Sequence, residues 1–200
     1  MYIQSEIDIR SKAGRVMDSL ASEINAFWLN EVGPAKWYAT DDQLDAEIRE
    51  RFMQPWQRAK AGELDCWITR PQSALALTIL LDQFPRNMFR GDKTAFSTDC
   101  KALAFAKKAI ALGHDLVVDE PERQFFYLPL MHSECIVDQD RCVRLFVTRM
   151  PKTGENNLSY AKEHRDVIRK FGRFPYRNTT LGRESSGQEQ EFLRANGYAA

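Results

Sequence analysis

The chain has 200 residues and a mass of 23.1 kDa, which is enough for one ordinary domain with a sizeable buried core. Its 28 basic and 28 acidic residues cancel, so there is no overall positive field to hold a nucleic-acid backbone. No apolar run reaches the roughly 20 residues that a membrane-spanning helix needs, and charges stand where a signal peptide would be apolar. These features predict a cytoplasmic protein without nucleic-acid or membrane partners.

Apolar side chains recur every three or four residues over most of the chain, which predicts an all-α fold. The segment that begins at Pro71 is apolar on all sides and is the expected core helix. Proline, glycine and capping residues divide the pattern into separate helices. These run from about Val16 to Gly33, from Asp41 or Asp42 to Gly62 with a kink or early end at Pro55, from Pro71 to Pro85, from Thr94 to Leu112, from Pro121 to Met131, from Arg141 to Met150, from Asn156 or Asn157 to Gly172, and from a capping box at Ser185 or Ser186 onward.

The order of these helices predicts how they pack. Short breaks between consecutive helices indicate antiparallel hairpins, one from 71–85 with 94–112 and one from 121–131 with 141–150. A succession of helix pairs is similar to a tetratricopeptide stack, whose repeats run about 34 residues. The predicted architecture is therefore a single domain over residues 1–200 in which antiparallel hairpins form a compact tetratricopeptide-like array.

The four cysteines show no metal-binding or redox spacing. Cys66, Cys100, Cys135 and Cys142 form no CxxC pair. They are expected to be reduced thiols that lie mostly in the core, and no metal site is predicted from them.

Several polar strings carry a resemblance to a known family. The chain resembles the bacterial family called domain of unknown function 924 in LALTILLDQFPRNMFRG (75 to 91), FFYLPLMHSE (125 to 134), DQ (138 to 139), YAKEHRDVIRKFGRFPYRN (160 to 178) and LGRES (181 to 185). The resemblance implies a tetratricopeptide-like helical fold and no established activity. The family usually has histidine where this chain has Tyr176, which removes support for a mechanism that needs a third imidazole there.

Asp82 stands at the end of the most apolar predicted helix. A buried carboxylate costs several kcal/mol unless it is paired, and Arg86 or Arg90 is the expected partner. Two interpretations follow. The pair either stabilises the turn from Phe84 to Asn87, or it forms a clamp in which Asp82 orients an arginine toward an anion.

A second polar group follows the apolar segment that ends at Met131. Glu134 and Asp138 would share one helical face and could bind a divalent cation, or act as acid and base. His132 precedes them, and a lone histidine of this kind is often a core residue with one hydrogen bond. The second histidine of HExxH is missing, which excludes a zinc-peptidase site of that type.

The third group begins at His164. Arginines interleaved with aromatic residues follow it, and they could bind phosphate or carboxylate through bidentate contacts. They could instead cap helix C-termini and cover aromatic rings. The residues concerned are Arg169, Arg173, Phe174, Tyr176, Arg177, Asn178 and Arg183.

Two functional hypotheses remain open at this point. One is a tetratricopeptide-like module that binds a peptide segment. The other is a polar pocket between helices that binds a small anionic molecule, with or without acid–base chemistry. No P-loop, GxGxxG or GxSxG supports a nucleotide cofactor or a serine hydrolase. The candidate acid–base residues are Asp82, His132, Glu134, Asp138 and His164, and the candidate anion-binding residues are Arg86, Asn87, Arg90, Arg173, Arg177, Asn178 and Arg183.

Overall fold

The computed structural model describes residues 19–196, and no strand occurs among them, which confirms the all-α prediction. The chain is helical from Ser19 and continues as a π-helix, η1 (Ala26–Val32); Val16 of the predicted first helix lies outside the described residues. The α-helices are α2 (Asp42–Ala61), α3 (Pro71–Met88), α4 (Asp99–Ala111), α5 (Leu128–Met131), α6 (Ile136–Arg149), α7 (Glu155–Phe171) and α8 (Gly187–Asn196). The short 3-10 helices are η2 (Asp65–Thr69), η3 (Lys93–Phe96), η4 (His114–Leu116), η5 (Glu122–Phe126) and η6 (Pro175–Arg177).

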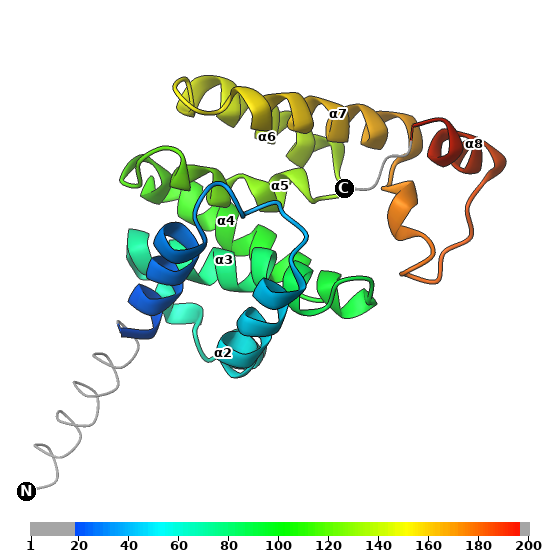
Figure 1. Ribbon diagram of the computed structural model, residues 1–200. Helices are drawn as coiled ribbons and strands as arrows, with labels where there is room; N and C mark the ends of the chain where they lie inside the picture. Colours follow the sequence, from blue (N-terminus) through cyan, green and yellow to red (C-terminus); the bar gives the residue numbers. More distant parts are fainter. Residues whose placement is uncertain (1–18, 197–200) are drawn as a thin grey trace, which may run out of the picture.

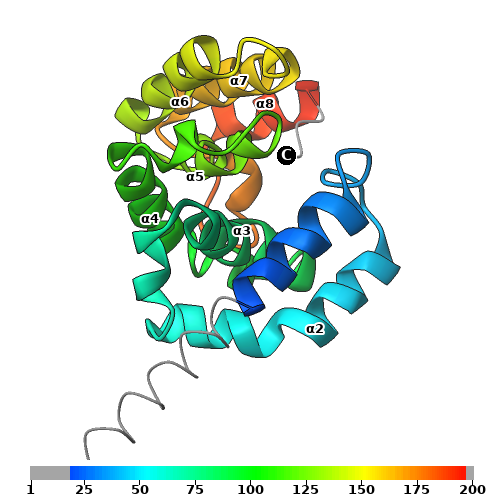
Figure 2. The ribbon, with the colours of Figure 1, turned by 90° about the vertical axis from the view of Figure 1, so that its left-hand side faces the viewer.

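Helix α3 lies at the centre of the molecule, with α2, α4 and α5 around it (Figures 1 and 2). All side chains from Ala74 to Leu81 are 0% exposed, so the expected core helix is confirmed. The aromatic rings of Phe27, Phe52 and Phe84 pack together, with centroids 5.0 Å apart for the first pair and 4.7 Å apart for Phe52 and Phe84. Burial of this apolar surface supplies the main driving force for the fold.

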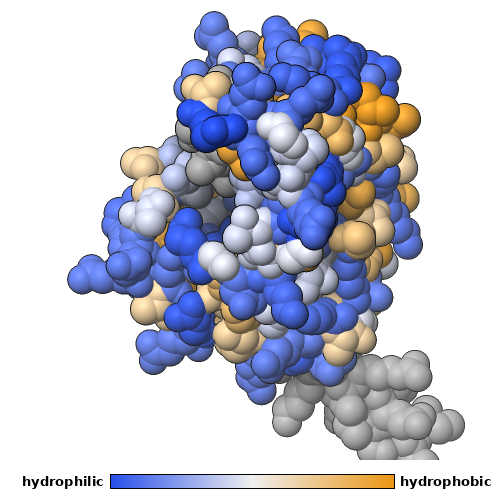
Figure 3. Space-filling view, turned by 90° about the vertical axis from the view of Figure 1, so that its right-hand side faces the viewer, coloured by the Kyte–Doolittle hydropathy of each residue, from blue (hydrophilic) through white to orange (hydrophobic). Residues whose placement is uncertain are grey.

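Helices α6 and α7 lie side by side along one edge of the molecule, and α8 follows at the end of α7 (Figure 1). The face of the molecule that Figure 3 shows is mostly hydrophilic, with a smaller hydrophobic area at its upper right. Between residues 19 and 196, no helix combines the length and the apolar character that crossing a membrane requires. The tetratricopeptide-like stacking of helix pairs stays a prediction.

Helix α3 does not stop at Pro85 as predicted, but continues to Met88. Proline has no N–H, so Pro85 cannot donate to the carbonyl of Leu81. The hydroxyl of Thr98 donates to that carbonyl instead, over 2.6 Å. The buried acceptor is thereby satisfied and the helix gains one further turn. Arg86 and Asn87 therefore belong to the same helix as Asp82.

Several other predicted boundaries are wrong. Helix α2 has the predicted start at Asp42 and the predicted exit at Gly62, and of the two alternatives at Pro55 the early end is wrong because the helix continues to Ala61. The predicted helix 94–112 begins only at Asp99, after η3, and the predicted helix 121–131 is divided into η5 and α5. Helix α6 begins at Ile136 rather than Arg141, and α7 begins at Glu155 after Gly154, so Asn156 and Asn157 do not cap it.

Three predicted helix ends, at α2, α7 and α8, are confirmed. The carboxylate of Asp41 accepts hydrogen bonds from the N–H groups of Gln43 and Leu44, at 3.0 and 3.1 Å. Gly172 ends α7 with a φ of 70°, which favours glycine. Ser186 and Glu189 form the predicted capping box at the start of α8.

The expectation of mostly buried cysteines is wrong. Only Cys142 is buried, while Cys66, Cys100 and Cys135 are exposed, and all four are free thiols.

Candidate functional site

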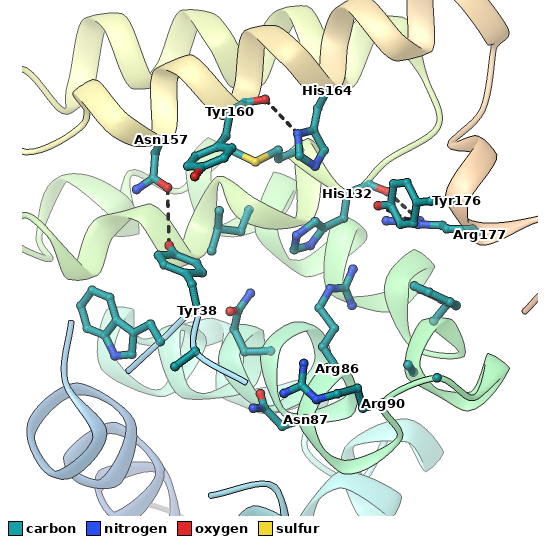
Figure 4. A pocket seen from close by; sticks show the side chains of 18 residues that line it. Tyr38, Arg86, Asn87, Arg90, His132, Asn157, Tyr160, His164, Tyr176 and Arg177 are labelled. Atoms are coloured by element: carbon teal, nitrogen blue, oxygen red, sulfur yellow. Dashed lines mark hydrogen bonds between the residues drawn. The ribbon is translucent and has the colours of Figure 1, made fainter. Parts of the chain in front are cut away.

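A cavity of about 470 Å³ lies where α3, α5 and α7 meet the segment around η6 (Figure 4). This size is in the range of small-molecule sites. The wall has a polar part and an apolar part. It is lined by Trp37, Tyr38, Ala39, Gln83, Arg86, Asn87, Arg90, Gly91, Ala95, Phe96, Leu128, Met131, His132, Asn157, Tyr160, His164, Tyr176 and Arg177.

A carboxylate of α3 holds the imidazole of His132 at the cavity wall. Oδ1 of Asp82 lies 2.8 Å from Nδ1 of His132, and Asp82 is only 1% exposed. The side-chain amide of Gln83 donates to the other oxygen of Asp82 over 2.6 Å. Arg86 adds an ion pair to Asp82 at 3.6 Å. The buried carboxylate is therefore compensated on both oxygens.

These contacts determine the protonation of the pair. Desolvation favours the neutral form of Asp82, yet the contacts with His132, Arg86 and Gln83 outweigh it and keep the pKa of this carboxyl below its usual value. Burial, followed by repulsion from Arg86, lowers the pKa of His132. At neutral pH the imidazole is therefore uncharged, with its proton on Nδ1 toward Asp82. Nε2 carries a lone pair and has no hydrogen-bond partner within the described part of the chain.

Arg86 and Arg177 share one carboxylate. Nη1 and Nη2 of Arg86 donate to Asp99 over 3.0 and 3.2 Å, and Nη1 of Arg177 lies 3.4 Å from the same carboxylate. Arg177 also donates to the carbonyl of His132 over 3.1 Å, and its guanidinium lies 4.8 Å from the ring centroid of Phe96. Both arginines are thus fixed in position at the wall.

A separate ion pair involves another arginine of the wall. Arg90 binds Asp45 of α2 through two hydrogen bonds, of 2.8 and 3.0 Å. Asn87 donates to the same carboxylate over 2.8 Å. Of the two predicted partners of Asp82, only Arg86 contacts it, because Arg90 is committed to Asp45.

The opposite wall comes from α7 (Figure 4). Nδ1 of His164 donates to the carbonyl of Tyr160 over 2.8 Å. Burial, with a smaller contribution from His132, lowers the pKa of His164 to about 4, so this imidazole is also uncharged at neutral pH. The hydroxyl of Tyr38 lies 3.5 Å from the amide oxygen of Asn157 and links α7 to the loop before α2.

Comparison with known proteins places the chain in a family. The family described as bacterial protein of unknown function (DUF924) matches residues 24–197. The chain belongs to DUF924. A solved structure of a protein of unknown function from Agrobacterium tumefaciens is 43% identical to this DUF924 chain, with a TM-score of 0.82; the match covers 88% of this chain and 97% of that one. No curated protein matches the DUF924 chain described here.

The predicted carboxylate pair of this DUF924 chain is not part of the cavity. Glu134 precedes α6 rather than sharing a helical face with Asp138. It accepts hydrogen bonds from Arg183 over 2.7 and 3.0 Å. Asp138 pairs with Lys107 at 2.6 Å instead. The prediction that the two carboxylates share one helical face is therefore wrong, and each has a different cationic partner.

Three of the predicted anion-binding residues also lie outside the cavity wall. Arg173 binds Glu189 through bonds of 2.7 and 2.8 Å, Arg183 binds Glu134, and Asn178 donates to Ser185 over 3.0 Å. These contacts tie the segment after α7 to α8 and to the start of α6. We call Glu134, Arg173, Arg183 and Glu189 the C-terminal cluster.

Seven of the predicted site residues lie together at the cavity: Asp82, Arg86, Asn87, Arg90, His132, His164 and Arg177. Two acidic partners of the arginines, Asp45 and Asp99, were not predicted. Asp99 is in the first turn of α4, where an acidic residue is explained by the helix dipole alone. Asp45 has the same explanation in α2. Phe96 and Tyr38 gave no signal. The remaining cavity residues that were not predicted as site residues are Trp37, Ala39, Gln83, Gly91, Ala95, Leu128, Met131, Asn157 and Tyr160.

Proposed function

We propose that this protein binds a small anionic molecule in the cavity and that His132 exchanges a proton with it. The observation that carries the proposal is the buried Asp82 carboxylate, 2.8 Å from Nδ1 of His132, which leaves Nε2 at the cavity wall. A neutral imidazole oriented by a carboxylate is the arrangement that general bases use.

The arginines of the wall support the anionic character of the ligand. Nε of Arg86 and Nη2 of Arg177 donate no hydrogen bond within residues 19–196. Their positions are nevertheless fixed through Asp99, so an anion would meet donors that are already ordered. Guanidinium groups of this kind suit carboxylate and phosphate groups.

The alternative is a tetratricopeptide-like module in which the cavity receives the end of a peptide. The α6 and α7 pair supports it, as do the side chains of Tyr38 and Tyr160, which are 61% and 56% exposed and line the cavity. Peptides with a free C-terminal carboxylate would then bind, and the same peptides with an amidated end would not. Binding of small molecules alone would favour the first proposal.

The test combines ligand screening with nitrogen NMR of the histidines. A panel of small carboxylates and phosphate esters is screened by thermal shift at neutral pH, and each hit is titrated while the His132 ring is observed. We expect Nε2 of His132 to be unprotonated in the free protein and to shift on binding, and His132→Gln to weaken binding by at least about ten-fold. A proton on Nε2 in the free protein would contradict the proposal.

His114 provides the matched control. Its Nε2 lies 3.0 Å from the carbonyl of Ile68, and it does not line the cavity. His114→Gln should leave the affinity unchanged. Equal binding by the wild type and His132→Gln would show that the imidazole takes no part.

A further inference from the structure

We infer that the ligand is a small monocarboxylate with an apolar body, and that its binding adds one proton to His132. This inference rests on the proposed function and specifies its ligand class. Three features of the cavity carry it: the balance of charges in the wall, the lone pair at Nε2 of His132, and the apolar surface beside them.

The charges in the wall sum to zero. Three arginines line the cavity and three carboxylates bind them, giving +3 and −3, while both histidines are uncharged at neutral pH. The pairs are Arg86 with Asp82, Arg86 and Arg177 with Asp99, and Arg90 with Asp45. The wall therefore has no net charge to balance an anion. An anion that enters without such compensation would be a buried, unpaired charge, which costs several kcal/mol.

His132 can supply the missing charge. The ionisable groups that face it are Asp82 and Arg86 of α3, Asp99 of α4, His164 of α7 and Arg177 of η6. An anion near Nε2 would meet a lone pair unless the imidazole takes up a proton, and the protonated ring then donates to the anion while Asp82 stabilises its charge. One proton compensates one negative charge. A carboxylate fits this balance, whereas a phosphate dianion would leave one charge uncompensated.

Part of the wall beside His132 is apolar. Leu128 and Met131 of α5 are 3% and 4% exposed and line the cavity beside His132. Trp37 and Phe96 add aromatic surface. Burial of apolar ligand surface against these side chains would contribute about 25 cal/mol per Å². The ligand therefore needs an apolar group as well as its carboxylate.

The experiment compares probes with related bodies and different heads, by calorimetry at pH 7.5. Phenylacetate carries one charge, phenylacetamide none and phenyl phosphate two, and acetate lacks the apolar body. We expect phenylacetate to bind at least about ten-fold more tightly than each of the others. Repeating the titration in buffers of different ionisation enthalpy should show uptake of close to one proton per phenylacetate.

The other outcomes of this titration separate the inference about the ligand from the proposed function. Phenyl phosphate binding as tightly as phenylacetate, or binding of phenylacetate without proton uptake, would refute the inference and leave the proposed function standing. Equal binding of phenylacetamide would show that charge is not recognised. Failure of all four probes at millimolar concentration, together with no hit in the wider panel, would overturn the proposed function itself.

A charge variant tests the balance directly. Asp99→Asn removes one negative charge from the wall and should shift the preference toward phenyl phosphate by about ten-fold. Glu189→Gln is the control, because it makes the same change in an ion pair of the C-terminal cluster and should leave the preference unchanged. An unchanged preference in Asp99→Asn would refute the inference, and the wild-type comparison decides it if that variant does not fold.

Discussion

In the cavity, Arg86 and Arg177 share one carboxylate, Asp99, whereas in the C-terminal cluster each arginine has a carboxylate of its own. Arg173 and Arg183 make two hydrogen bonds each to Glu189 and Glu134. An arginine that has a carboxylate of its own uses its N–H groups to link two segments of the chain. A shared carboxylate fixes two arginines and leaves N–H groups open, so the same residue types hold structure in one region and form a cavity wall in the other.

The largest expected difference between the two regions is in stability. Asp82→Ala removes a carboxylate that is 1% exposed, takes the buried acceptor from His132 and leaves Arg86 with Asp99 alone, which should lower the free energy of unfolding by about 3–5 kcal/mol. Glu189→Ala should cost only about 1–2 kcal/mol, because the Arg173 side chain is 32% exposed and water can replace the lost bonds. Urea denaturation at pH 7 measures both. Equal losses would show that the two regions are equally dependent on their carboxylates.

The next effect is the response to pH. The pKa of His164 is about 4 in the folded protein and about 6.5 when unfolded, so the unfolded chain takes up a proton first as the pH falls. The free energy of unfolding should therefore fall between pH 7 and pH 5, with a contribution of about 2 kcal/mol from His164. Because the pKa of Glu189 is lowered, to about 2, its stabilisation is lost only below the usual glutamate range.

His164→Gln checks this assignment. Glutamine keeps an N–H for the carbonyl of Tyr160 and cannot titrate. The variant should lose about 2 kcal/mol less than the wild type between pH 7 and pH 5, measured by urea denaturation at each pH. The same loss in both proteins would place the pH response elsewhere.

The smallest effect concerns the C-terminal cluster alone. Ser186→Ala removes the hydroxyl that accepts from the N–H of Glu189 at the start of α8, and should cost about 1 kcal/mol. Thermal unfolding should show a drop of a few degrees, and the NMR signals of His132 and His164 should not move. Movement of those signals would reveal coupling between the cluster and the cavity.

Local signals in the sequence predicted the helices where a side chain acts on its own neighbours. Asp41, Gly172 and the Ser186–Glu189 pair satisfy backbone groups within a few residues, and all three were confirmed. The end of α3 was not predictable in this way. The carbonyl of Leu81 that Pro85 leaves open is satisfied by Thr98, seventeen positions away from Leu81 and on another element.

Part of the candidate site was also predictable. Asp82 and His132 stand out because they follow strongly apolar segments, where burial of a polar group without a partner is costly. Arg177 stands out because it belongs to a run of arginines and aromatic residues that follows His164. Which charges pair with them was not predictable. Arg177 and Asp99 are 78 residues apart and Arg90 and Asp45 are 45 apart, and 28 basic and 28 acidic residues allow many combinations of similar local character.

The sequence by itself determined that this protein is helical, that α3 forms its centre, and which family it resembles. The helices and the central position of α3 follow from the periodicity of apolar side chains and from capping groups that act locally, whereas the family resemblance rests on particular polar strings. Only the tertiary structure decided that Asp82 holds His132 at a cavity, that Asp99 balances two arginines, and that Glu134 and Arg173 lie elsewhere. The physical reason is that a charge pairs with whichever partner the packed helices bring within a few ångströms, and that distance is set by the core.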